Sequence, residues 1–98
     1  MRTLDSTLRW KAVSDYVTVT VASAQTAAIS TNVFEVRVVS TTNCHINIGA
    51  NPTAAATDNN GIYLPANVVE FYHVSPGQKI AVIRDTADGV FCMAEMTR

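Results

Sequence analysis

Two cysteines and two histidines are the side chains of this sequence best suited to chemistry: Cys44, His45, His73 and Cys92. Their number matches a Cys₂His₂ zinc site, but structural zinc ligands come in close pairs such as C-x-x-C, and no such pair occurs here. A nucleophile and base at 44 and 45 is also disfavoured, because adjacent strand residues point to opposite faces. We therefore expect two core thiols and two surface or rim histidines, with no catalytic residue, no metal and no cofactor.

The acidic residues are scattered along the sequence. Four aspartates fall in expected turns, where Asp side chains bond nearby backbone: Asp15, Asp58, Asp85 and Asp88. Three glutamates fall within expected strands: Glu35, Glu70 and Glu95. Nothing indicates a paired-carboxylate glycosidase site. The stretch TDNNG lacks the alternating ligands and the distal Glu of a calcium loop.

Size and charge narrow the class of protein. With 98 residues the chain forms one domain, small enough to gain stability from a partner. A net charge of −1 provides no basic field for nucleic acid, and no apolar run approaches the ~20 residues of a membrane span. Only 15% of the residues are charged, so the surface resembles an interface more than that of a freely solvated monomer.

Period-two alternation predicts most of the strands. In YVTVTVAS, VFEVRVV and CHINIG, one face of each expected strand is apolar. The residues expected to face inward are Val17, Val19, Val21, Phe34, Val36, Val38, Cys44, Ile46 and Ile48. In VFCMAEM, Val90, Cys92 and Ala94 share a face, whereas VVEFYHV is apolar on both faces and its phase stays open.

Further segments complete the expected sheet structure. KIAVIR suits a central strand, and LRWKAV is a further candidate strand. GIYLP suits an edge strand because Pro65 ends pairing. The short STTN connection predicts a hairpin between VFEVRVV and CHINIG, and SPGQ predicts a turn that closes another. The result is an all-β fold: a single small β-sandwich or barrel, jelly-roll or Ig-like, of about seven antiparallel strands. Residues 1–12 form an N-terminal arm and residues 13–98 the domain.

The stretch TTNCHINIGANPTA and the later phrases LPA, PGQKIAVI and AEMTR resemble a group of small virion proteins of tailed bacteriophages. The likeness covers Ser40 to Arg98. The last phrase, AEMTR, departs from the pattern at Ala94, where that group has Thr.

This resemblance implies a non-enzymatic structural protein of the virion, assembled in the host cytoplasm. The expected role is capsid decoration, or cement, with the major capsid protein or other virion proteins as partners. It also implies a homo-oligomer, for which a trimer at a three-fold position is our expectation. A neck, tail or other minor virion role is the alternative within this resemblance.

Two segments are the expected partner-binding sites. The basic N-terminal arm contributes Arg2, Leu4, Arg9, Trp10 and Lys11. The loop 50–61 contributes Asn51, Pro52, Thr57, Asp58, Asn59 and Asn60. Simpler interpretations are a solvated terminus, a solvated loop, and a Trp10 that covers the end of the sandwich.

A free carbohydrate- or receptor-binding module is the alternative function. It needs an exposed aromatic patch, which Tyr63, Phe71 and Tyr72 could supply.

Overall fold

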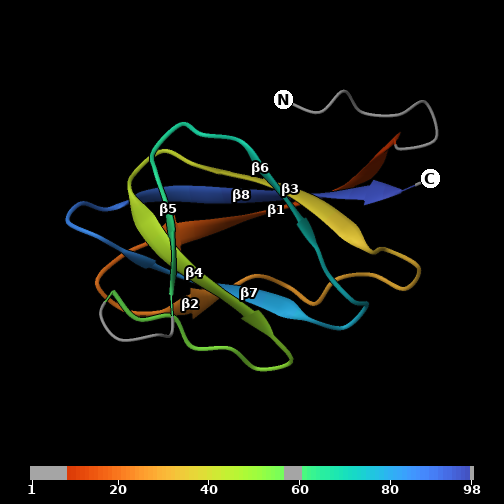
Figure 1. The fold of residues 1–98 in the computed structure, drawn as a ribbon, viewed down its shortest axis with the longest axis horizontal. Coiled ribbons are helices and arrows are strands. Elements are labelled where there is room, and N and C mark those ends of the chain that lie inside the picture. Colours follow the sequence, from red (N-terminus) through yellow and green to blue (C-terminus); the bar gives the residue numbers. More distant parts are fainter. Residues whose placement is uncertain (1–8, 57–60, 98) are drawn as a thin grey trace.

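The computed structural model describes residues 9–56 and 61–97, and side chains over 15–56 and 61–96. These residues form eight strands in two antiparallel sheets (Figure 1). Sheet A has the order β1 (Arg9–Val19), β8 (Gly89–Thr97), β3 (Glu35–Ser40), β6 (Glu70–His73). Sheet B has the order β2 (Ala24–Gln25), β7 (Lys79–Arg84), β4 (Cys44–Gly49), β5 (Ile62–Leu64).

The strand pairs are nested within one another along the chain. β1 pairs with β8, β2 with β7, β3 with β6 and β4 with β5. This is the pairing of a jelly roll, so the predicted all-β sandwich is confirmed, with eight strands in place of about seven. β7 lies between two neighbours and β5 lies at an edge, as predicted. β1 begins at Arg9, so residues 9–12, which we assigned to the arm, are part of this strand.

Both predicted hairpins are wrong. β3 and β4 belong to different sheets, and so do β6 and β7. The link from β3 to β4 makes four Cα–Cα steps, which reach ~13–14 Å at ~3.3–3.6 Å each. Stacked sheets lie only ~10 Å apart, so a short link can cross between sheets as readily as it can close a hairpin. The SPGQ turn itself is present, since Gly77 has a φ of +87° and the N–H of Gln78 donates to the carbonyl of Ser75 at 3.1 Å.

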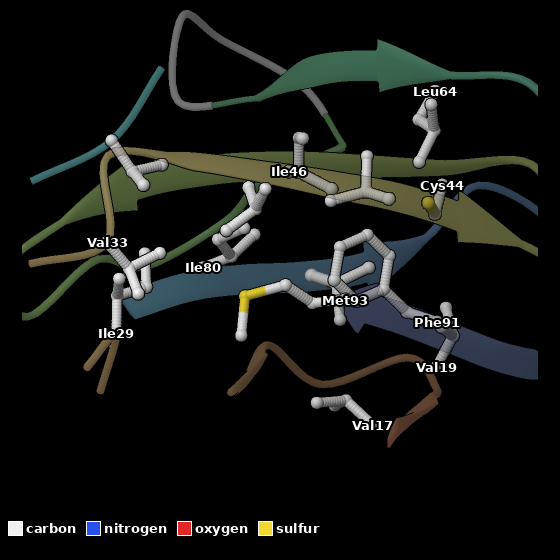
Figure 2. Close-up of a cluster of buried hydrophobic side chains, with 14 residues drawn as sticks. Val17, Val19, Ile29, Val33, Cys44, Ile46, Leu64, Ile80, Phe91 and Met93 are labelled. Carbon is white, nitrogen blue, oxygen red and sulfur yellow. The ribbon is translucent and has the colours of Figure 1, made fainter. Parts of the chain in front are cut away.

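The core lies between the two sheets and consists mainly of Val, Ile and Leu, with Cys44, Phe91 and Met93 among them (Figure 2). The alternation in β3, β4 and β8 places Val36, Val38, Cys44, Ile46, Phe91 and Met93 inside, each at most 1% exposed. Val90, Cys92 and Ala94 share the opposite face of β8, as predicted. The open phase of VVEFYHV is also resolved, because Val74 is buried and Tyr72 packs against the core.

Two predicted core residues are at the surface. Phe34 is 59% exposed because it precedes β3, and the buried Val33 takes its place in the core. Val21 is 69% exposed because β1 ends two residues earlier, at Val19.

The segment Ser40–Asn43 joins three connections at one end of the sandwich. The N–H of Thr41 donates to the carbonyl of Val90 at 2.9 Å, and its hydroxyl accepts the N–H of Val90 at 2.9 Å. The Oδ1 of Asn43 accepts the N–H of Ala66 at 2.8 Å, and its carbonyl accepts the N–H of Asp85 at 3.0 Å. The β3–β4, β5–β6 and β7–β8 connections therefore stabilise one another.

At the opposite end of the sandwich, a buried carboxylate binds the β2–β3 connection to β8. Glu95, on β8, is 1% exposed, and its Oε2 accepts both the N–H and the hydroxyl of Ser30, at 2.9 and 3.0 Å. The neighbouring Ile29 is buried and exchanges backbone hydrogen bonds with the SPGQ turn, through Gly77 and Gln78. The long β2–β3 connection is thus fixed over the end of the core.

Candidate interaction surfaces

Cys44 and His45 do not form a catalytic pair. The thiol of Cys44 is fully buried in the core, where burial raises its pKa against the smaller lowering effect of a hydrogen bond with Ser40. His45 points to the outer face of sheet B, where its Nε2 lies 3.0 Å from Oδ1 of Asp85 and its ring lies 5.4 Å from that of Tyr63. Strand alternation separates the two side chains, as the sequence indicated.

The other two members of the candidate metal set lie elsewhere. His73 is exposed at the end of β6, as expected of a surface histidine. Cys92 is half-buried on the outer face of sheet A, so it is not the core thiol that we expected. Among the residues that the structure describes, no group of three or more His, Cys, Asp or Glu side chains could hold a metal ion. The same residues contain no helix of the length and apolar character needed to cross a membrane.

The described aspartates make structural contacts within the fold. Asp15 lies within β1 and not in a turn, which corrects our prediction, and its carboxylate accepts the N–H of Ala27 at 2.6 Å. Asp88 pairs with Arg84 at 2.7 Å across the β7–β8 turn. With Asp85 bound to His45, each of these carboxylates connects two segments of the fold.

Most of the predicted partner-binding residues are outside the part of the chain described in full. Arg9, Trp10 and Lys11 lie on β1, where the backbone alone is described. Six other predicted partner-binding residues fall outside the described residues: Arg2, Leu4, Thr57, Asp58, Asn59 and Asn60. The candidates whose side chains can be assessed are Asn51 and Pro52.

Asn51 and Pro52 belong to a loop that packs on the outer face of sheet B. Pro52 is buried, and Gln25 of β2 donates to its carbonyl at 2.7 Å and to Oδ1 of Asn51 at 2.9 Å. Two more bonds hold the loop, from Asn47 to the Thr53 carbonyl at 3.1 Å and from the N–H of Ala54 to the Ser23 hydroxyl at 3.0 Å. This half of the loop is therefore part of the folded domain, not a free binding arm.

Gly61 lies where the loop returns to β5. A Cβ there would fall 2.4 Å from the carbonyl oxygen of Ala55 and 2.8 Å from Cβ of His45. A Cβ atom does not fit in this space, so glycine is required for the close approach of the loop to β4. No sequence pattern had marked Gly61 as more than a turn residue.

Most of the exposed large apolar side chains of the described residues lie in two regions, and Val21 and Phe34 lie outside both. The first, called here the β5–β6 surface, spans β5 and the connection after it and comprises Ile62, Tyr63, Val68 and Val69, which are 38–51% exposed. The second is on the outer face of sheet A, where Tyr16 is 68% and Val90 41% exposed. These regions are the best candidates for contact with another molecule, because exposed apolar groups mark interaction sites when they cluster.

The three aromatic residues of the alternative carbohydrate site do not share a face. Tyr63 points outward from sheet B, and Phe71 and Tyr72, being adjacent on β6, point to opposite sides of sheet A. Tyr72 packs against the core, and its pKa is raised by burial first and then by the charge of nearby Glu70. A single stacking platform for a sugar is not formed by these rings.

Comparisons with protein-family models, with characterised proteins and with solved structures find no match to this chain.

Proposed function

We propose that this chain is a non-enzymatic structural protein of a tailed-bacteriophage virion, a decoration protein that binds the shell of the major capsid protein. The observation that supports the proposal most directly is the resemblance of Ser40–Arg98 to small virion proteins of such phages. It spans β4 to β8 and the turns between them, which is more than half of the chain.

The positions of the shared phrases add detail to this support. Thr41 and Asn43 join the connections at one end, Ile46 and Leu64 are in the core, and Pro52 fixes the loop on sheet B. These residues therefore maintain the domain itself. The likeness supports a common small jelly roll, and a partner would be selected by residues outside these phrases.

The β5–β6 surface is the part of the described structure best suited to the shell. Its four apolar side chains are exposed on β5, an edge strand, and on the connection that follows it, and Glu70 is the one charged residue between Ile62 and Phe71. Burial of such side chains against a partner stabilises the complex by roughly 25 cal/mol per Å² of apolar area. The proposed contact is thus hydrophobic, and we expect it to depend only weakly on salt.

The test is whether the chain is present on assembled particles and where it lies. Purified particles would be examined by mass spectrometry and by electron cryomicroscopy, with density at a repeated position on the shell as the expected result. Absence from the particle would reject the proposal. Density confined to the neck or tail would show that the protein has a neck or tail role and not a decoration role.

A binding assay identifies the surface. Shells without the protein are mixed with the wild-type chain and with Tyr63→Ser/Val68→Ser, and the bound fraction is measured after sedimentation. We expect the double variant to bind at least about tenfold more weakly, as for loss of a central apolar anchor. Val21→Ser, which removes a still more exposed apolar side chain from the β1–β2 connection, is the control and should bind normally.

A further inference from the structure

The four edge strands of the two sheets differ greatly in length. β2, β5 and β6 have 2, 3 and 4 residues, whereas β1 has 11. Short edge strands are one of the devices by which proteins prevent unwanted pairing, because they present few free N–H and C=O groups. β1 lacks this protection.

The regular part of β1 runs from Ser14 to Val19. The register with β8 shifts between Trp10 and Ser14 and is continuous from Ser14 onward. On the other side of this stretch, no segment of the described chain pairs with β1. About six residues, roughly 20 Å of strand, therefore present alternate backbone groups at an open edge.

The side chains along this edge offer little resistance to pairing. The stretch SDYVTV contains one charged residue, Asp15, and its carboxylate already accepts the N–H of Ala27. Tyr16 and Thr18 are exposed on the outer face of sheet A, while Val17 and Val19 are buried in the core. No lysine or proline, the residues that usually block an edge, interrupts the stretch.

We propose that this edge pairs with the same edge of a second copy of the chain, antiparallel across a twofold axis. Two four-stranded A sheets then form one continuous sheet of eight strands. Identical edges are sufficient for such a contact, since a twofold interface needs one self-complementary surface. The inference does not depend on the virion role, and it proposes a dimer in place of the trimer that we expected from the sequence resemblance.

One register between the two β1 strands places compatible side chains opposite each other. With the axis at Val17, Tyr16 of each copy lies opposite Thr18 of the other, an aromatic and β-branched pair of the kind that stabilises antiparallel sheets. Each Asp15 lies opposite Val19. The two Asp15 residues are then about four residues, or ~13 Å, apart along the strand, beyond the ~8–10 Å over which charges interact at moderate salt.

A charge-pairing experiment tests this register. In Tyr16→Lys/Thr18→Lys, two pairs of like charges oppose each other across the axis, and in Tyr16→Lys/Thr18→Glu the same pairs have opposite charges. Mass is measured by sedimentation over a range of protein concentrations. We expect dimers of the wild type and the Lys/Glu variant, and a dissociation constant at least about tenfold higher for the Lys/Lys variant. Tyr63→Lys, which adds one charge at an exposed tyrosine of sheet B, is the control and should remain dimeric.

Amide hydrogen exchange of the wild-type chain gives an independent readout. Exchange over Ser14–Val19 should slow as the concentration rises, because the edge N–H groups become paired. This measurement decides the question if circular dichroism shows that a double variant does not fold. A monomer at every concentration, a dimer that the Lys/Lys variant leaves intact, or a trimer, which a twofold contact cannot form, would each overturn the proposal.

Discussion

The carboxylate of Glu95 offers the sharpest test of how the ends of this sandwich are held. Its Oε2 accepts the N–H and the hydroxyl of Ser30, and the side chain is 1% exposed. Replacement by alanine leaves the N–H of Ser30 without this acceptor. We expect Glu95→Ala to lower the free energy of unfolding substantially.

The magnitude follows from three losses and one gain. The bond from the N–H to a charged acceptor is worth ~1.5–3 kcal/mol, and the bond from the hydroxyl ~1 kcal/mol, because that hydroxyl can turn to water. Loss of the buried methylene adds about 0.8 kcal/mol. Removal of a buried charge recovers part of its desolvation cost. The net loss should be about 2–4 kcal/mol.

Two further variants separate charge from shape. Glu95→Gln keeps an oxygen acceptor for Ser30 but makes both bonds neutral, which roughly halves their strength, so the loss should be about 1–1.5 kcal/mol. Ser30→Ala removes the hydroxyl alone and should cost about 1 kcal/mol. The double variant Glu95→Ala/Ser30→Ala should then lose less than the sum of the single losses, because the two residues are in contact.

The assay is urea unfolding followed by circular dichroism, with amide exchange at Ser30 as a local readout. Exchange at Ser30 should be faster in Glu95→Ala than in Glu95→Gln. The reasoning is refuted if Glu95→Ala is as stable as the wild type, or if the two single losses add fully.

Four further predictions concern two glycines, the buried thiol and the loop. Gly89→Ala should cost about 1–3 kcal/mol, because a Cβ there lies 2.7 Å from Oγ1 of Thr41 and from Cγ2 of Thr42. Gly77→Ala should cost about 1–2 kcal/mol through its φ of +87° alone, since no atom lies within 4 Å of the added Cβ. For either glycine, a variant as stable in urea as the wild type would contradict the explanation. Burial raises the pKa of Cys44 above its ordinary 9.0, so the unfolded chain loses this proton first, and stability should fall as the pH rises above about 9. The fall should be shallower in Cys44→Ala, whereas parallel curves for the two proteins would show that the thiol is not responsible. Gln25→Ala removes the bonds to Asn51 and Pro52, so exchange at Ala54 should become faster with a loss of about 1–2 kcal/mol, while unchanged exchange would mean that the remaining bonds suffice.

Strand positions were predictable because burial on one face leaves a period of two in the sequence. CHINIG places Cys44 and Ile46 in the core and His45 outside, and KIAVIR lies between two neighbours. The pairing of the strands was not predictable in the same way. A short connection such as STTN fits both a hairpin and a crossing between sheets, and the choice depends on partners far away in the chain, such as β8 for β3.

The surface residues were harder to predict for a related reason. Loop 50–61 looks polar and solvated, yet Pro52 and Ala54 are buried because Gln25 and Ser23, some thirty residues earlier, bond to it. In the sequence Glu95 is an ordinary strand residue, and only the fold brings Ser30 beside it. Local patterns report which residues alternate, and they contain no information on which distant backbone group a polar side chain will meet.

The nested pairing of the strands determines when each one can find its place during synthesis. β1 is made first and pairs only with β8, which is made last of the eight. Until then both edges of β1 lack a partner in sheet A. Closure of so long a loop is entropically costly, so folding should be slow and should begin in the middle, where β4 and β5 are close in sequence. A growing chain is therefore most exposed to misassembly through β1 until β8 has been made and pairs with it.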